Sequence, residues 1–325
     1  MEYMPDFKLH RPKNKDDAAR IKSESPESLF VAGGTDMIVN VRRGIEQPKN
    51  LIDLSDITEV KEINQRESEL VIGSGVTLDK LANSEKIKSY YPAIADAALS
   101  IAGSTHQKYG TVGGNLCLDT RCLFYNQSEW WRQSNDYCMK ERGDICHVAP
   151  GGKRCFAAFS GDLAPAMLVY NAEIKIFGPN GERQLTLQDL YRNDGMNHLT
   201  LESDELIVSI HLPNSLAGSP SKYEKARIRG SIDFPLAGAA VRLEKENNKI
   251  TDITVALTGV NPFPQIIKNT EAMIGMEINE QTLDQLRENV RKQAKPMKTT
   301  TVAPWYRRRV VGAIARRLTY ELSIE

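Results

Sequence analysis

The sequence lacks long hydrophobic runs, and it lacks an excess of charge of either sign. No stretch approaches the roughly 18 consecutive apolar residues of a membrane-spanning helix, and the opening MEYMPDFKLHRPKNKDD has no apolar core that could serve as a secretory signal. Lysine plus arginine number 42 and aspartate plus glutamate number 42, a balance that disfavours nucleic acid or an anionic membrane as the main partner. We therefore expect a soluble, cytoplasmic protein.

Common nucleotide-binding and hydrolytic motifs are also missing. There is no G-x-G-x-x-G between a strand and a helix and no G-x-x-x-x-G-K-[ST], so a nicotinamide Rossmann domain and a P-loop are both disfavoured. Neither G-x-S-x-G nor H-E-x-x-H occurs, and none of the five histidines pairs evidently with a nucleophile. We therefore predict no catalytic residue in this chain.

Cysteine is absent outside one short window, between Cys117 and Cys155. Random scatter would crowd five cysteines in this way on the order of once in a thousand sequences, and in a reducing cytoplasm such a group indicates metal rather than disulfides. The spacing C-x4-C-x15-C-x7-C-x8-C is neither a ferredoxin run nor a zinc ribbon. Thiolates suit both iron–sulfur clusters and zinc, so the spacing alone leaves the metal open.

The chain is long enough for two domains, and 41% of its residues are apolar. The stretch 214–221 (NSLAGSPS) is rich in turn residues and predicts a boundary between domains at 1–216 and 217–325. We predict strands at 29–32, 37–41, 51–54, 69–72, 166–177, 205–212, 239–244 and 250–257. We predict helices at 15–25, 78–88, 93–102, 280–293 and 305–322, with a loop-rich stretch at 103–160. In the last helix, a core-facing stripe is expected at Val311, Ala315, Leu318 and Leu322.

Two glycine pairs share one chemical logic, in VAGGTD at 31–36 and TVGGN at 111–115. Glycine lets the backbone approach a ligand closely, and successive N–H groups can form a concave site suited to a diphosphate. Thr35, Thr111 and Asn115 can add side-chain donors. A tight turn is the alternative for either pair alone, and the spacing does not identify the ligand.

These motifs resemble the flavin subunit of the xanthine dehydrogenase and carbon monoxide dehydrogenase family. IGSGVTL, SGDLAPAM, DELIVSIHLP, YEKARIRGSIDFPLAGAAV and YRRRVVGAIARRL extend the resemblance over nearly the whole chain. The resemblance implies an α+β fold. It comprises an FAD-binding domain of the vanillyl-alcohol oxidase (PCMH) type with two subdomains, then a smaller α/β domain like the C-terminal domain of carbon monoxide dehydrogenase flavoproteins.

The resemblance also implies a noncovalent FAD site. The two glycine motifs would surround the diphosphate, Ile101 would contact the flavin, Asp162 would accept the ribose hydroxyls, and Ile207 and Lys225 would lie near the flavin. Ordinary packing or a solvated charge is the alternative for each residue alone, most of all for Lys225. The implied FAD-binding residues are Phe30, Val31, Ala32, Gly33, Gly34, Thr35, Asp36, Met37, Ile101, Thr111, Val112, Gly113, Gly114, Asn115, Asp162, Ile207 and Lys225.

Between GGNLC and SGDLAP most of the family runs directly on, whereas this chain inserts about forty residues. The run TRCLFYNQSEWWR resembles the insertion of 4-hydroxybenzoyl-CoA reductase β subunits. The implied ligands of one [4Fe–4S] cluster are Cys122, Cys138, Cys146 and Cys155. Cys117 is expected to be an unligated, buried thiol. His147 is expected beside the ligands, with iron ligation as the alternative, and Trp130 and Trp131 either cover the cluster or form a core for the insertion.

Carried through, the resemblance implies an electron-transfer subunit of a molybdenum-containing 4-hydroxybenzoyl-CoA reductase in anaerobic aromatic degradation. Electrons would pass from ferredoxin through [4Fe–4S] and FAD toward the partner subunits. The implied partners are a small subunit with two [2Fe–2S] clusters and a molybdopterin-containing large subunit, in a dimer of heterotrimers. Two alternatives stay open: a related hydroxylase subunit that passes electrons outward to an acceptor, and a zinc-stabilised scaffold without a redox role.

Overall fold

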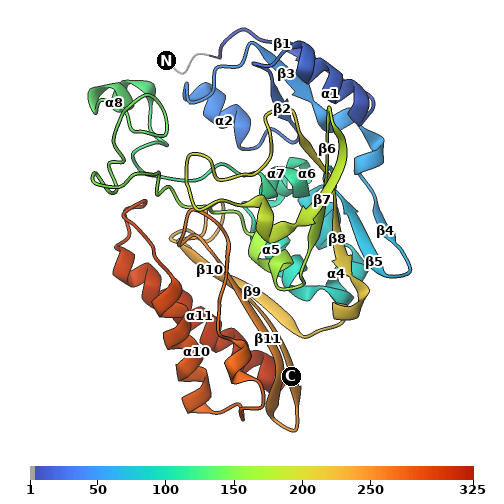
Figure 1. The fold of residues 1–325 in the computed structure, drawn as a ribbon, viewed down its shortest axis with the longest axis vertical. Coiled ribbons are helices and arrows are strands. Elements are labelled where there is room, and N and C mark those ends of the chain that lie inside the picture. Colours follow the sequence, from blue (N-terminus) through green and yellow to red (C-terminus); the bar gives the residue numbers. More distant parts are fainter. Residues whose placement is uncertain (1–3) are drawn as a thin grey trace.

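A computed structural model describes residues 4–325 (Figure 1). The chain begins with a small parallel sheet in the order β1-β3-β2, flanked by two helices. Its strands are β1 (Lys8–His10), β2 (Leu29–Val31) and β3 (Asn50–Asp53), and its helices are α1 (Lys15–Glu24) and α2 (Met37–Arg42). Strand β2 ends just before the first glycine pair and α2 begins just after it, so this subdomain carries that loop at the end of a strand.

A second, antiparallel sheet has the order β4-β5-β8-β6-β7. Its strands are β4 (Ile63–Gln65), β5 (Glu69–Gly73), β6 (Glu173–Gly178), β7 (Gly181–Thr186) and β8 (Leu206–Pro213). Buried residues alternate with more exposed ones along β6, as expected for a strand with one face on the core. Strand β8 pairs with both β5 and β6 and therefore lies in the middle of this sheet. It joins a strand that precedes the insertion to one that follows it.

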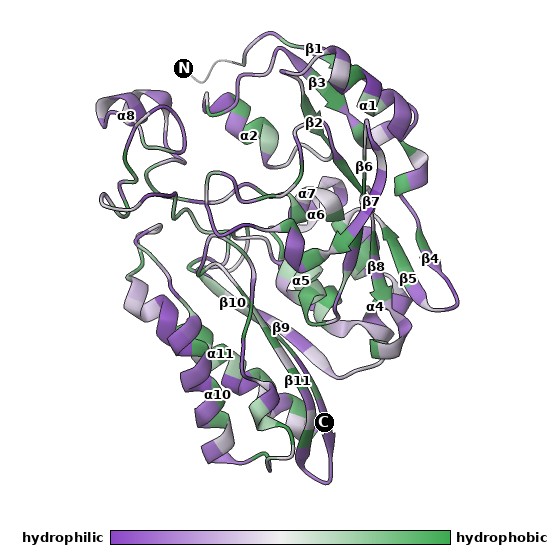
Figure 2. Cartoon of the chain, in the orientation of Figure 1, coloured by the Kyte–Doolittle hydropathy of each residue, from purple (hydrophilic) through white to green (hydrophobic). Residues whose placement is uncertain are grey.

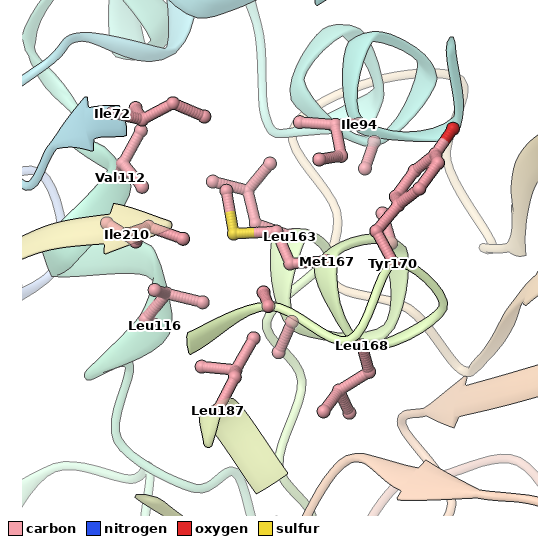
Figure 3. Close-up of a cluster of buried hydrophobic side chains, with 14 of the residues drawn as sticks. Ile72, Ile94, Val112, Leu116, Leu163, Met167, Leu168, Tyr170, Leu187 and Ile210 are labelled. Carbon is pink, nitrogen blue, oxygen red and sulfur yellow. The ribbon is translucent and has the colours of Figure 1, made fainter. Parts of the chain in front are cut away.

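Short helices cover one face of this sheet. They are α3 (Leu78–Ala82), α4 (Glu85–Tyr90), α5 (Pro92–Ser100), α6 (Ser104–Tyr109), α7 (Val112–Leu116) and α9 (Leu163–Leu168). Figure 3 shows the core that they share with the strands, where Ile72 and Ile210 face Val112 and Leu116 of α7 and Met167 of α9. Because α7 carries the second glycine pair, burial of Val112 and Leu116 fixes that loop against the sheet.

The C-terminal part is an antiparallel sheet, β12-β11-β10-β9, covered by two long helices. Its elements are β9 (Ser221–Ala226), β10 (Ala237–Glu246), β11 (Lys249–Thr258), β12 (Gln265–Ile266), α10 (Glu280–Gln293) and α11 (Pro304–Ile324). Figure 1 shows α10 and α11 side by side. The stripe of Val311, Ala315, Leu318 and Leu322 is buried, as predicted.

The cysteine-rich insertion lies outside both domain cores, and α8 (Glu129–Ser134) is its one regular helix (Figure 1). Figure 2 shows that α8 is mostly hydrophilic, in contrast to the hydrophobic strands β5 and β8 of the large sheet. Short 3-10 turns complete the fold at Leu54–Asp56, Thr58–Val60, Leu187–Leu190, Asn214–Leu216 and Glu271–Met273. Across residues 4–325 no helix combines the length and apolar character that crossing a bilayer demands.

The fold class is as predicted, and three of the predicted elements are wrong in detail. The segment 37–41 is the helix α2 rather than a strand, because a five-residue apolar run has no decisive period. The predicted helix 78–88 is two helices, broken where the Asn83 side chain donates to the Asp79 carbonyl at 3.0 Å. The predicted strand 166–177 begins as α9 and becomes β6 only after Asn171, whose φ of +53° ends the helix.

Candidate functional site

A cavity of about 510 Å³ opens where the two glycine motifs meet. The first motif lines it continuously from Leu29 to Met37, and the second contributes Thr111, Gly114 and Asn115. Ile101 and Asp162 complete the part of the lining that the sequence predicts. Segments separated by about 130 residues, from Val31 to Asp162, therefore come together around one space.

The glycines of the two motifs have different reasons to be glycine. A Cβ on Gly33 would lie 1.9 Å from the Tyr109 carbonyl oxygen, and a Cβ on Gly113 would lie 2.8 Å from the Ser74 side chain. Gly34 has a φ of +67°, which L side chains rarely adopt. Gly114 is the least constrained of the four, because its Cβ would meet only the Thr111 hydroxyl, at a close 3.1 Å. Three glycines thus shape the loops, and Gly114 keeps side-chain atoms out of the cavity.

The second motif is held in place by its own side chains. The Thr111 hydroxyl accepts from the Gly114 N–H at 3.2 Å and so caps α7. The side-chain oxygen Oδ1 of Asn115 accepts a hydrogen bond from the Leu163 N–H at 3.0 Å, which fixes α7 against the start of α9. Asp162 directly precedes Leu163, so this bond positions the predicted ribose-binding carboxylate relative to the glycine loop.

Asp162 is buried at the end of the cavity and is held from the second domain. The Tyr223 hydroxyl donates to Asp162 Oδ1 at 2.6 Å, and the Lys225 ammonium lies 3.0 Å from Oδ1 and 3.1 Å from Oδ2. Burial raises the pKa of Asp162, and the Lys225 charge and the Tyr223 hydrogen bond oppose that rise. Lys225 is therefore a buried partner of the carboxylate rather than the solvated charge that was the alternative.

Some predicted residues lie beside the cavity instead of on it. Val112 and Gly113 are buried within α7, and Ile207 is 5% exposed in the core of β8. Lys225 lies behind Asp162. The predicted residues that do line the cavity are Phe30, Val31, Ala32, Gly33, Gly34, Thr35, Asp36, Met37, Ile101, Thr111, Gly114, Asn115 and Asp162.

The lining also includes residues that were not predicted, among them Val39, Asn40, Arg43 and Glu46 after the first motif. Two further unpredicted segments are the stretch from Cys117 to Arg121 and the loop from Arg229 to Phe234 in the second domain. The Ile232 N–H donates to the Ala102 carbonyl at 3.0 Å, which holds the second loop over the cavity. Burial raises the pKa of Cys117 to about 12, so a neutral thiol faces this space. The run RGSIDFPL is part of the family resemblance and includes the second loop, but it indicated no individual residue as part of the cavity lining.

The other four cysteines converge on a second, separate cavity. The four cysteines that line it, Cys122, Cys138, Cys146 and Cys155, are all buried, and Lys140 and His147 line it too. All five cysteines are free thiols. The cavity is small, about 10 Å³, and among residues 4–325 no three His, Cys, Asp or Glu side chains already form a site for a metal ion. The donor set suits a thiolate-bound centre, and the loops that carry it would have to move apart to admit one.

The aromatic residues of the insertion do not all behave as expected. Trp130 is 73% exposed, so it neither covers the cysteines nor forms a core. The Trp131 ring lies 6.3 Å from the Phe124 ring, which lines the cysteine cavity. His147 Nε2 is bonded to the Tyr137 carbonyl, so this nitrogen is already engaged by backbone.

Two buried cations hold the insertion together, and one of them, Arg132, also attaches it to the rest of the chain. The Arg132 side chain is 1% exposed, and it donates to Glu141 at 2.8 Å and to the Gly44 carbonyl at 3.1 Å. The Lys140 ammonium lies 2.6 Å from Asp119 Oδ1. Lys140 lines the cysteine cavity and Asp119 lines the large one, so this ion pair joins the walls of the two cavities.

Comparison with known proteins gives two family matches that together span the chain. Residues 5–215 match the family described as FAD binding domain in molybdopterin dehydrogenase, and residues 221–322 match the CO dehydrogenase flavoprotein C-terminal domain. The xanthine dehydrogenase FAD-binding subunit of Escherichia coli O157:H7 is 23% identical over 96% of this chain and 94% of its own length. The aldehyde oxidoreductase FAD-binding subunit of Escherichia coli K12 is 29% identical over 83% of this chain and 86% of its own.

Solved structures share the fold. Carbon monoxide dehydrogenase from Hydrogenophaga pseudoflava superimposes with a TM-score of 0.81 at 22% identity, covering 98% of this chain and 97% of that one. Reconstituted CO dehydrogenase from Oligotropha carboxidovorans gives a TM-score of 0.81 at 23% identity, with 99% of both chains covered.

Proposed function

The chain belongs to the family of FAD-binding subunits of molybdopterin-dependent dehydrogenases, and from that premise we propose that it is an electron-transfer subunit whose FAD lies in the cavity between the two glycine motifs. The observation that carries the proposal is the cavity itself, which both glycine loops and Asp162 line together. FAD can accept two electrons and release them singly, so it can connect a two-electron reaction to one-electron carriers.

Each part of the cavity has a role in holding that cofactor. Backbone N–H groups of the two loops are proposed to bind the diphosphate, because Gly114 leaves their approach free of side-chain atoms. Asp162, paired with Lys225, is suited to accept hydrogen bonds from ribose hydroxyls. Ile101 offers an apolar surface to the flavin ring.

Substituting Gly114 with valine tests the site. The added Cβ would meet no backbone atom within 4 Å, only the Thr111 hydroxyl, so the chain is expected to fold but to bind FAD roughly 5- to 150-fold more weakly. Gly151→Val is the matched control, because a Cβ at Gly151 meets nothing within 4 Å. Titration of the FAD-free chain with FAD gives both affinities. Unchanged affinity in folded Gly114→Val would place the cofactor elsewhere.

The flavin is proposed to be noncovalent, since neither glycine motif contains a histidine or a cysteine that could form a link. Denaturing precipitation of the holoprotein is therefore expected to leave all flavin absorbance in the supernatant. A coloured pellet after extensive washing would contradict this.

We further propose that Cys122, Cys138, Cys146 and Cys155 hold one [4Fe–4S] cluster, with Cys117 outside the ligand set. The shared cavity of these four buried thiols supports the proposal, as does the position of Cys117 on the other cavity. Such a centre beside FAD would form an electron relay. A bound zinc ion with no redox role is the competing assignment, and visible absorption separates the two, because an iron–sulfur cluster adds a broad brown band and zinc adds none.

We propose more specifically that this chain is a subunit of a 4-hydroxybenzoyl-CoA reductase. Electrons would come from ferredoxin and pass to a small subunit with two [2Fe–2S] clusters and a large molybdenum subunit, in a dimer of heterotrimers. The run TRCLFYNQSEWWR supports this assignment. The second candidate is a dehydrogenase subunit passing electrons outward, which the xanthine and aldehyde enzymes among the relatives favour.

The substrate reaction is proposed to take place on a partner subunit, because the sequence of this chain offers cofactor-binding motifs but none of the catalytic motifs sought. The isolated, FAD-loaded chain is expected to show no reduction of 4-hydroxybenzoyl-CoA with a chemical reductant, whereas the assembled complex shows it. Product formation followed by chromatography measures both. Turnover by this polypeptide alone would overturn the assignment of the substrate chemistry to a partner.

A further inference from the structure

Arg121 brings a positive charge into the proposed FAD cavity from the first residues of the insertion. Its side chain is 13% exposed and forms an ion pair with Asp36, the last residue of the first glycine motif. Its guanidinium carbon lies 4.4 Å from the centre of the Phe234 ring, which belongs to the second domain. Arg121 thus touches the glycine loop on one side and the C-terminal domain on the other, and all three residues line the cavity.

The backbone of Arg121 is fixed, whereas one of its side-chain donors is not used. Its N–H donates to the Ala158 carbonyl at 2.7 Å and its carbonyl accepts from the Ala158 N–H at 2.8 Å. Its Nε is buried and has no hydrogen-bond partner among residues 4–325. Leaving a buried donor of a charged group unsatisfied is costly, so a group that completes this bond gains free energy.

We propose that Arg121 is a cofactor-binding residue, whose guanidinium donates to an acceptor oxygen of FAD. This inference rests on the proposed function. The acceptor is a phosphate oxygen or a flavin carbonyl, since both are hydrogen-bond acceptors suited to a guanidinium. Asp36 and the Phe234 ring position the guanidinium for this contact, and Cys122, the next residue, lies on the cysteine cavity. Arg121 is then the direct connection between the insertion and the bound flavin.

The chain contains a matched control for this arginine. Arg154 also lies in the insertion, also precedes a cavity cysteine, and stacks its guanidinium carbon 4.6 Å from the centre of the Phe156 ring. It differs in two respects: its side chain donates to a backbone carbonyl, that of Asn193, where Arg121 pairs with a carboxylate, and it lies outside the large cavity. A general effect of removing an Arg–Phe contact from the insertion would therefore appear equally in both positions.

The test compares FAD dissociation constants of the full-length chain carrying Arg121→Met, Arg121→Lys or Arg154→Met. Loss of a charged hydrogen bond is expected to weaken FAD binding roughly 10- to 150-fold in Arg121→Met, with a smaller loss in Arg121→Lys, which keeps the charge. Arg154→Met is expected to stay within about twofold of the parent chain. Circular dichroism confirms that all three are folded, and if Arg121→Met is not, Arg121→Lys carries the comparison.

ADP titrated into the same variants identifies the acceptor. A parallel loss of ADP affinity in Arg121→Met indicates the diphosphate, and unchanged ADP affinity with weakened FAD indicates the flavin. FAD affinity equal to that of the parent chain in both Arg121 variants overturns the proposal, as does an equal loss in Arg154→Met. If the parent chain itself binds no FAD, the proposed function fails, which is a different result.

Discussion

Replacing Cys146 with serine is expected to abolish iron binding by this chain while FAD stays bound. Cys146 lies on the cysteine cavity with Cys122, Cys138 and Cys155, and a cubane cluster needs all four thiolates. Cys146 is the preferred position for the test because Cys122 is bonded directly to Arg121, which lines the large cavity where we propose that FAD binds. Cys117→Ser is the control, since this thiol lines the large cavity and is expected to leave the iron content unchanged.

Iron and acid-labile sulfide per flavin, determined in protein purified under argon, give the answer. About four of each per FAD are expected in the parent chain and none in Cys146→Ser. Zinc in place of iron and sulfide would show that the assignment of an iron–sulfur cluster is wrong. An equal loss of iron in Cys117→Ser would show that the ligand set is wrong.

Loss of the cluster should also disorder a defined part of the insertion. Its apolar cluster is small and is built around Cys122, Tyr125, Cys138, Cys155 and Ala157. With so little buried apolar surface, this unit is expected to depend on the proposed metal ligation for its stability. The Arg132 network does not involve the cysteines, so α8 is expected to stay attached while 138–155 becomes the site of proteolytic cleavage.

Long periodic elements were predictable from the sequence because one face of each is continuously apolar. The helix α10 has the predicted bounds Glu280–Gln293, and the predicted stripe of α11 is buried. Short elements were not predictable, since a run such as 37–41 fits either a strand or a helix until its neighbours are known. The turn at Asn171 likewise depends on a backbone conformation that composition does not specify.

The candidate site was predictable where backbone chemistry defines it and not where charges pair across the fold. The two glycine motifs were visible because glycine is required for close approach. Arg121 and Phe234 were not, since their contact joins residues 113 positions apart. Lys225 was expected near the flavin, but nothing in its sequence context indicated that it would be buried against Asp162.

That buried pair gives a second large effect. Lys225→Met is expected to destabilise the chain by about 3–5 kcal/mol near neutral pH, because it leaves the Asp162 carboxylate buried without its cation. Lys222→Met is the matched control on the same strand, where the lysine is partly exposed and pairs with Glu321, and its cost should be below about 1 kcal/mol. Urea unfolding with and without FAD measures both and separates the cofactor's contribution.

The pH dependence identifies the carboxylate as the cause. Burial already raises the pKa of Asp162 in the folded chain, and losing the Lys225 charge raises it further. With a folded pKa above the unfolded one, the folded state binds the proton more tightly, so stability falls as pH rises through that window. The penalty of Lys225→Met should therefore shrink on acidification toward the unfolded pKa of about 4.

Asp162→Asn combined with Lys225→Met should recover part of the lost stability at neutral pH, because no buried charge then remains unpaired. The same double variant should still bind FAD weakly, since the proposed ribose acceptor has lost its charge. A pH-independent penalty in Lys225→Met, or a double variant less stable than either single one, would show that Lys225 acts through packing instead.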